Sequence, residues 1–346
     1  MFEMKKKIFA ACVLMAFVGM FVFAATAAAR DLPTGLVTHT GTVVGTPTQW
    51  RLYDCGTLVV GGGFIDRSAG WSSSPWHDYR FEIEQIIFTA PNIAGTSLQW
   101  LFSDLANVTA IYGLEHFDIR NMAVTFGMFS GASSLTSLDL SVWDISNVTN
   151  MGDMFSWASG LTDLNLTGWD TGNVTNMGNM FRDASGLTSL DLSGWDTRNV
   201  TNMQGMFSGH WLHGSNLRQL TLGENFRFAA DNPNLPAVLA DGTFTGYWQN
   251  VAGGTPGNPQ GAHVFTSDEL VEFYRAAPPN LADTWVWQRN YLPLCDGCNA
   301  YPCECDFGIV PPTGIPGIAW TLYAMLSLAA ISAGFWGVLL RTKRQK

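Results

Sequence analysis

Three nearly identical stretches decide the fold: LTSLDLSVWDISNVTNMGDMF (135–155), LTDLNLTGWDTGNVTNMGNMF (161–181) and LTSLDLSGWDTRNVTNMQGMF (187–207). Each begins 26 residues after the one before it. A fixed period of this length is typical of repeat proteins, in which one unit buries its apolar side only against neighbouring units. The centre of the chain is therefore expected to be a solenoid.

Each copy opens with leucines at its first, fourth and sixth positions, as at Leu135, Leu138 and Leu140. This spacing predicts a short strand whose alternate side chains enter a core, with an outward Asp or Asn between them. A tryptophan follows three residues later in every copy: Trp143, Trp169 and Trp195. Its position in the spacing points inward, so we expect core packing rather than a platform for sugar rings.

The second half of each copy has helical spacing. In the middle copy the apolar side chains fall at i, i+3, i+6 and i+7, namely Val174, Met177, Met180 and Phe181. Asp170 or Thr171 is available as the N-cap. We expect each copy to form a strand, a turn, a helix and a turn. The predicted fold class is an α/β solenoid, a right-handed superhelix with a parallel sheet on one face.

Degenerate copies extend the array on both sides. Phe117 and Phe129 stand 26 residues before Trp143 and Phe155, and the leucine spacing returns in LRQLTL from Leu217. The predicted segments are a β-rich N-terminal cap, the solenoid and a C-terminal cap, at residues 30–97, 98–226 and 227–293. Imperfect terminal copies are usual at the ends of such arrays.

These repeats resemble the BspA-like leucine-rich-repeat surface proteins, in particular their 26-residue repeat with the pattern LDLSxFDTSNVTNMxxMF. Tryptophan replaces the commoner Phe of that pattern. The stretches QWRLYDCGTLVVGGG (49–63) and GYWQNVAGGTPGNPQG (246–261) are similar to segments that often flank such arrays. The resemblance implies a bacterial cell-surface binding or adhesion protein, without naming a ligand.

Both ends of the chain carry features of export. Residues 1–29 place Lys5, Lys6 and Lys7 before an uncharged apolar run and the small-residue stretch ATAAA, which is typical of a secretory signal peptide. Residues 315–340 are apolar and uncharged over more than the roughly 20 residues that a membrane-spanning helix needs, and the basic RTKRQK follows. We expect a body outside the cell with a tail in the membrane.

The C-terminal ending resembles the cell-wall sorting signal of Gram-positive surface proteins, Leu-Pro-any-Thr-Gly, with valine in place of leucine. The residues concerned are Val310, Pro311, Pro312, Thr313 and Gly314. The resemblance implies that a sortase cuts between Thr313 and Gly314 and joins the chain to a cell-wall amine. A permanent membrane anchor is the alternative. The predicted segments are a Cys-rich stalk with the sorting motif (294–313) and a hydrophobic anchor with a basic tail (314–346).

Charge excludes one class of partner. Residues 30–313 hold 11 Arg and no Lys against 27 Asp plus Glu. Because a phosphate backbone repels an acidic surface, we expect no nucleic-acid binding. Basic partners and metal cations remain open.

The outward strand positions are the first candidates for partner contact, since an exposed sheet of a solenoid is a common binding surface. These positions carry Asp139, Asp163, Asn165 and Asp191. Carboxylates on neighbouring strands repel one another, and a basic partner or a cation such as Ca²⁺ would relieve this. An ordinary solvated strand face is favoured over a metal site.

Four cysteines lie close together in CDGCNAYPCEC, at Cys295, Cys298, Cys303 and Cys305. Zinc ligands have similar spacing, but only four residues separate the two pairs, and an exported chain favours two disulfides. Cys55 is left without an evident partner. The NVT sequons at Asn107, Asn147, Asn173 and Asn199 recur at one phase, so hydrogen bonds at a repeat turn explain them better than glycosylation.

No catalytic motif is present: the histidines share no repeat phase, and GxSxG, HExxH and phosphate-loop patterns are missing. We expect no enzymatic activity and no cofactor. The predicted function is non-catalytic binding or adhesion at the surface of a Gram-positive-type bacterium, to a host, matrix or bacterial surface protein through the solenoid strand face. The alternative is a carbohydrate-binding or hydrolytic cell-wall protein.

Overall fold

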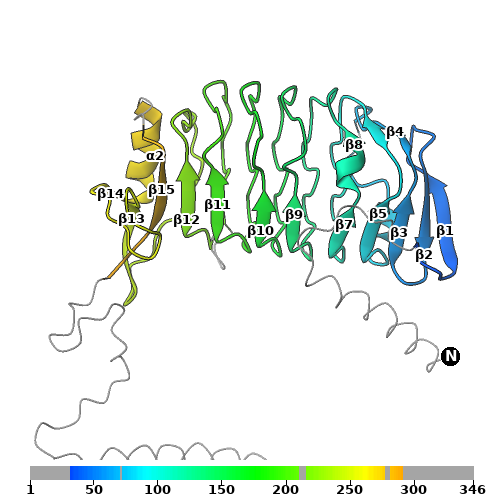
Figure 1. The fold of residues 1–346 in the computed structure, drawn as a ribbon, viewed down its shortest axis with the longest axis horizontal. Coiled ribbons are helices and arrows are strands. Elements are labelled where there is room, and N and C mark those ends of the chain that lie inside the picture. The colour runs from blue at the N-terminus through cyan, green and yellow to red at the C-terminus, as the bar shows by residue number, and fades with distance from the viewer. Residues whose placement is uncertain (1–31, 71, 210–215, 277–280, 291–346) are drawn as a thin grey trace, which may run out of the picture. The chain divides into compact units, whose positions relative to one another are not determined.

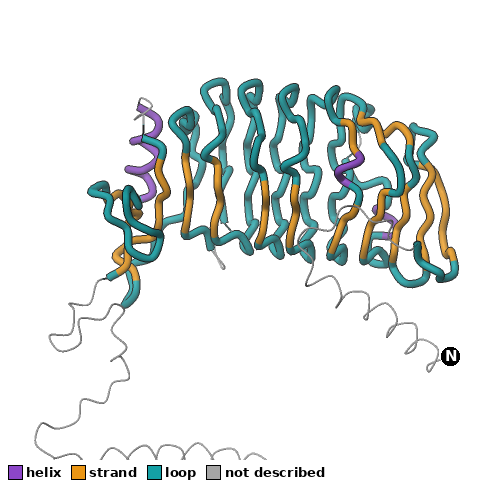
Figure 2. The backbone as a smooth tube through the Cα atoms, in the orientation of Figure 1, coloured by secondary structure: helices purple, strands orange, loops and turns teal. Residues whose placement is uncertain are grey.

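The computed structural model describes residues 32–70, 72–209, 216–276 and 281–290. Within them the backbone runs as successive coils of strands and turns (Figures 1 and 2). The strands are short: β1 (Val37–Thr42), β2 (Gln49–Tyr53), β3 (Thr57–Val60), β4 (Gly63–Ile65), β5 (Gln85–Phe88), β6 (Asn92–Ala94), β7 (Ala110–Tyr112), β8 (Phe117–Asp118), β9 (Ser137–Asp139), β10 (Asp163–Asn165), β11 (Ser189–Leu192), β12 (Gln219–Leu222), β13 (Phe244–Asn250), β14 (Val264–Phe265) and β15 (Asp283–Arg289). The described helices are η2 (His77–Tyr79), η3 (Leu114–His116) and α2 (Ser267–Ala276).

Parallel pairing between coils confirms the predicted solenoid and its parallel sheet, and the solenoid is a β-solenoid rather than an α/β one. β3 pairs with β5 and β5 with β7, β9 pairs with β10, and β11 pairs with β12, all in parallel. A second parallel ladder joins β4, β6 and β8. This pairing already begins upstream of the 26-residue copies. We call the side carrying β9, β10 and β11 the strand face, defined by the outward residues 137, 139, 163, 165, 189 and 191.

Antiparallel strands flank the parallel ladders on both sides. β1 and β2 extend the sheet from β3, with β2 antiparallel to both neighbours. At the other end β12 pairs antiparallel with β15, which pairs with β13, and β13 with β14. Helix α2 follows β14 directly in the chain.

The predicted helix of each copy is wrong. In its place lies a ladder of single parallel bridges that joins Val124, Asn150, Asn176 and Asn202 from successive copies. We call this side, residues 150–158 and their equivalents, the turn face. A helix needs about 8–10 Å to its neighbour, whereas strands stack at about 4.8 Å. Copies that stack at strand spacing on both sides leave no room for helices.

Backbone hydrogen bonds on the turn face alternate between two kinds of partner. The N–H groups of Met151, Asp153 and Phe155 donate to carbonyls of the next copy at 2.8–2.9 Å. The N–H groups of Met154 and Ser156 donate three residues back within their own copy. The N–H group of every second residue thus donates to the neighbouring copy. An α-helix would not allow this, because its backbone hydrogen bonds stay within one segment.

The alternation requires a left-handed residue at a fixed place in each copy. Gly127, Asp153, Asn179 and Gly205 occupy this place, with φ of 61, 55, 55 and 66°. Glycine, Asn and Asp adopt this conformation more readily than other residues. The sequence therefore meets a backbone requirement that the apolar spacing alone does not reveal.

The inward columns are confirmed even though the helix is not. Trp143, Trp169 and Trp195 are 2–3 % exposed. Phe129, Phe155 and Phe181 stack from copy to copy with ring centroids 5.7 Å apart. Equivalent side chains thus share one dry interior, where the burial of apolar surface drives the stacking of copies.

Candidate binding surface

Short polar side chains cover the strand face. In the β9–β10 pair Asp163 lies beside Ser137 and Asn165 beside Asp139, while Leu138 and Leu164 point inward between them. Ser137, Asp139, Asp163, Ser189 and Asp191 are exposed. The structure therefore brings all four predicted contact residues to one side of the solenoid.

Three of these residues also close a local turn. The side-chain Oδ1 atoms of Asp139, Asn165 and Asp191 accept the N–H two residues later at 3.0, 3.1 and 2.9 Å. Such turns are a common use of Asp and Asn after a strand. These bonds fix the orientation of the three side chains on the strand face.

Asn165 separates two carboxylates in the copy order Asp139, Asn165, Asp191. Partial burial raises the pKa of the Asp139 carboxyl, but hydrogen bonds from Ser141 and Asn165 outweigh burial and hold the pKa below its ordinary value. Asp139 therefore stays ionised at neutral pH. The amide of Asn165 thus stands in the copy order where a third carboxylate would repel both neighbours.

The sequon asparagines hold neighbouring copies together. The side-chain Nδ2 atoms of Asn147, Asn173 and Asn199 donate to a carbonyl of the preceding copy at 2.7–2.8 Å. Asn107 makes the equivalent bond to Phe81 at 2.9 Å. The amide nitrogen that a glycan would use is engaged in each case, in agreement with the predicted structural role.

The tryptophans reveal a difference between two junctions of the strand face. Nε1 of Trp143 donates to the Leu114 carbonyl, and Nε1 of Trp169 donates to the Leu140 carbonyl, both at 3.0 Å. By the same spacing Trp195 should reach Leu166. Instead its Nε1 is buried without a partner.

The parallel ladder is interrupted at the same place. The Leu140 N–H donates to the Asn165 carbonyl at 3.0 Å, which closes the β9–β10 junction at its carboxyl end. The equivalent bond from Leu166 to Asp191 is missing, and β10 and β11 belong to different sheets. Figure 1 shows β9 with β10 and β11 with β12 as two separate pairs.

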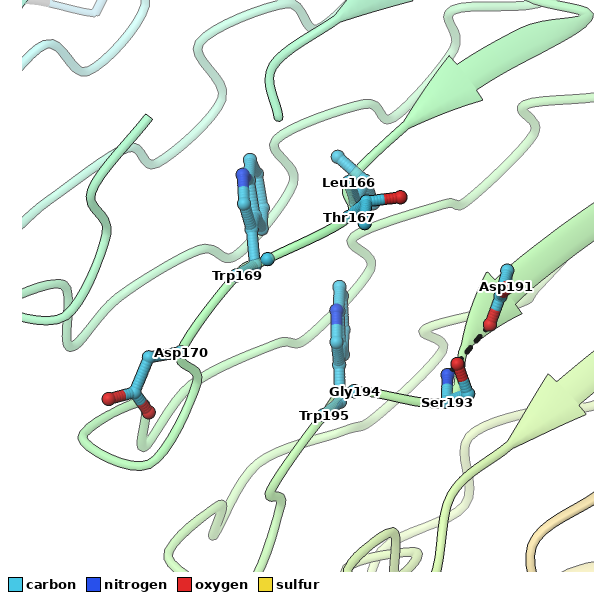
Figure 3. Close-up of a pocket in the computed structure, with 9 residues that line it drawn as sticks. Leu166, Thr167, Trp169, Asp170, Asp191, Ser193, Gly194 and Trp195 are labelled. Carbon is cyan, nitrogen blue, oxygen red and sulfur yellow. Dashed lines mark hydrogen bonds between the residues drawn. The ribbon is translucent and has the colours of Figure 1, made fainter. Parts of the chain in front are cut away.

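A groove of about 370 Å³ opens at this interruption. Its lining is polar at the rim and apolar at the base: Leu166, Thr167, Gly168, Trp169, Asp170, Asp191, Ser193, Gly194 and Trp195. Figure 3 shows the two indole rings side by side at the base, with Asp170 and Asp191 on opposite sides of them. The rings lie 6.3 Å apart at an angle of 9°.

Nothing in the sequence indicates this groove, because the residues GWDT recur unchanged at Gly168 and Gly194. The two sites differ in the missing bonds and in the backbone of the glycine, since Gly168 has a φ of 84° and Gly194 does not have a positive φ. The strand-face carboxylates, by contrast, were identified from their alternation with buried leucines.

Other predicted features lie outside the described residues. They are the signal peptide (1–29), the cysteines Cys295, Cys298, Cys303 and Cys305, the motif Val310–Gly314 with Pro311, Pro312 and Thr313, and the anchor. Among the described residues Cys55 is a free thiol, and no cluster of three metal-ligating side chains occurs. A search of those residues also finds no helix with the length and apolarity to cross a membrane.

The stacked copies and the exposed strand face define the chain as a β-solenoid repeat protein with a leucine-rich strand motif. Residues 96–219 match the family described as "Mycoplasma protein of unknown function, DUF285".

One solved structure, a leucine-rich repeat protein from Eubacterium ventriosum, aligns at 16 % identity and a TM-score of 0.23. The alignment covers 54 % of this chain and 44 % of that protein, so the chain spans less than half of its length. A comparison with curated proteins finds no match.

Proposed function

We propose that the chain is a non-catalytic binding protein displayed on the outside of a Gram-positive-type bacterium, where its strand face recognises a protein or matrix partner. The observation that carries the proposal is the polar strand face of β9, β10 and β11, on which Asp139, Asp163 and Asp191 are exposed and Asn165 is half-buried. A rigid row of this kind presents several contacts at once without the cost of ordering a loop.

The charge of this surface favours a basic partner. Asp139 is held in its ionised form, and the described part of the chain has an excess of carboxylates over arginines. Electrostatic attraction of this kind speeds association and weakens as salt screens it. Binding is therefore expected to fall when the ionic strength is raised.

Display outside the cell is supported by the predicted signal peptide and sorting motif. A sortase would cut between Thr313 and Gly314 and transfer the chain to the wall; the alternative is a retained membrane anchor. Wall attachment and a membrane anchor differ in the treatment that releases the protein from cells. After sorting, muralytic digestion and not detergent releases the protein from sortase-competent cells, and release by detergent alone would contradict sorting.

The recognition surface is tested with the full-length protein on immobilised extracellular-matrix proteins and on intact bacterial cells. Asp139→Lys combined with Asp163→Lys should weaken binding at least tenfold by reversing charge on β9 and β10. Glu115→Lys combined with Glu224→Lys changes the net charge equally at exposed residues outside the strand face and serves as the control. Equal losses in both double variants would show a general charge effect and contradict strand-face recognition.

A further inference from the structure

The groove between β10 and β11 carries an inference that does not depend on the proposed recognition of a protein partner. We infer that it is a binding site for a neutral, hydroxyl-rich ligand, namely a sugar ring. The interruption of the ladder leaves polar groups at the groove without partners.

At the carboxyl end of the interruption, where the groove lies, two donors and one acceptor lose their bonds. The donors are the Leu166 N–H and the Trp195 Nε1, and the acceptor is the Asp191 carbonyl. Trp195 is only 2 % exposed, so its N–H is poorly placed to bond to bulk water. A buried donor without a partner destabilises the protein, and a ligand that supplies an acceptor recovers this free energy.

The indole N–H of Trp195 faces the groove. Its ring is nearly parallel to that of Trp169, and Figure 3 shows the nitrogen atoms on the same edge of both rings. In Trp169 that edge meets the Leu140 carbonyl. In Trp195 the same edge is turned toward Leu166, and both residues line the groove.

The rim decides the class of ligand. Asp170 and Asp191 would repel an anion, while the indole N–H needs an acceptor, which an ammonium or guanidinium group does not have. A hydroxyl group meets both requirements, because its oxygen accepts from the indole and its proton is donated to a carboxylate. The hydroxyls of Thr167 and Ser193 offer further partners of the same kind.

The size and place of the groove favour a ring over an extended peptide. Its volume of about 370 Å³ lies at the small end of ligand pockets. It is confined to the carboxyl ends of β10 and β11 and the turns that follow. An added strand would have to run along the whole of β10 and β11, whereas the groove is confined to their carboxyl ends and one ring fills a compact space.

Two variants change the groove and leave the fold intact. Trp195→Phe removes the N–H but keeps an aromatic ring, as Phe117 does at the equivalent place of an earlier copy. Gly194→Phe puts a ring at the mouth of the groove, where a Cβ would meet no atom within 4 Å. The matched controls are Trp143→Phe and Val142→Phe, which change the same two positions in the first copy, outside the groove.

The test is binding of the full-length protein to a panel of neutral monosaccharides, uncharged oligosaccharides and uncharged wall polysaccharide, with short peptides as a further arm. At least one saccharide should bind, roughly tenfold more weakly to Trp195→Phe for the lost hydrogen bond, and not measurably to Gly194→Phe. The two controls should bind as the unchanged protein does.

If a monosaccharide binds, the ligand of the site is a free sugar ring. If only the polysaccharide binds, the ligand is the end of a saccharide chain. The strand-face variant Asp139→Lys with Asp163→Lys should keep saccharide binding, so failure of one proposal leaves the other standing. The inference is overturned if no saccharide binds, if only peptides bind, or if Gly194→Phe binds as well as Val142→Phe.

Discussion

The β9–β10 and β10–β11 junctions are built from nearly the same residues and differ in their hydrogen bonds. At the first, the ladder is complete and the Trp169 indole bonds to Leu140. At the second, β10 and β11 do not pair and the Trp195 indole has no partner.

On the turn face both junctions are closed, because Asn150, Asn176 and Asn202 bridge in sequence. Thr171 adds a further link, since its Oγ1 accepts from the Asp196 N–H at 2.9 Å. The copies therefore stay together while the strand face opens locally. A repeat sequence determines which side chains meet. It does not determine whether the strands at every junction pair in the same way.

The largest difference should come from the leucines at the two junctions. Leu140 is fully buried at the closed junction, whereas Leu166 lines the groove. Leu→Ala in a core costs about 2–5 kcal/mol, and the cost depends on the cavity that is left. We expect Leu140→Ala to destabilise more than Leu166→Ala by about 1 kcal/mol, because water reaches the space beside Leu166.

Urea unfolding of the two leucine variants measures this difference. An equal loss of unfolding free energy in both variants would mean that water does not reach Leu166 in the groove.

A smaller difference is expected from the indole N–H groups. Trp169→Phe and Trp195→Phe lose the same atoms, but only Trp169→Phe also breaks a hydrogen bond and leaves the Leu140 carbonyl without it. Trp169→Phe should therefore be less stable than Trp195→Phe by about 1 kcal/mol. Thermal unfolding of both variants checks the order, and the reverse order would show that the second junction closes in solution.

The smallest expected change in stability concerns the turn face, where both junctions are closed. Burial raises the pKa of the Asp153 carboxyl, although a hydrogen bond with Asn179 and the charge of Arg182 oppose this. A carboxyl with a raised folded-state pKa makes its ionised form destabilising at neutral pH, and this penalty disappears once it is protonated in both states.

Asp153→Asn puts in the first copy the residue that the next copy has at Asn179, with the same φ of 55°. We expect it to stabilise the protein at pH 7 by up to about 0.5 kcal/mol and to lose this advantage below about pH 4, where carboxyls protonate. Unfolding midpoints at several pH values measure the effect. A constant advantage at all pH values would assign it to backbone preference instead of charge.

The 26-residue period and the alternation of leucines were sufficient to predict the parallel sheet, the inward tryptophans and the outward carboxylates. These features depend on which residues alternate and recur, and the chain carries that pattern directly. The predicted helix failed because spacing such as that of Val174, Met177 and Phe181 also suits a ladder of turns. Choosing between them requires the distance between copies.

The sequence by itself determined the stacking of equivalent residues, since apolar columns at a fixed period can be buried only against one another. The tertiary structure alone decided that the second half of each copy is a ladder of turns, because strand spacing on both sides excludes helices. It also decided that the second junction opens. Two copies with the same GWDT residues acquire different hydrogen bonds only through their neighbours in space, so the groove has no signature in either copy.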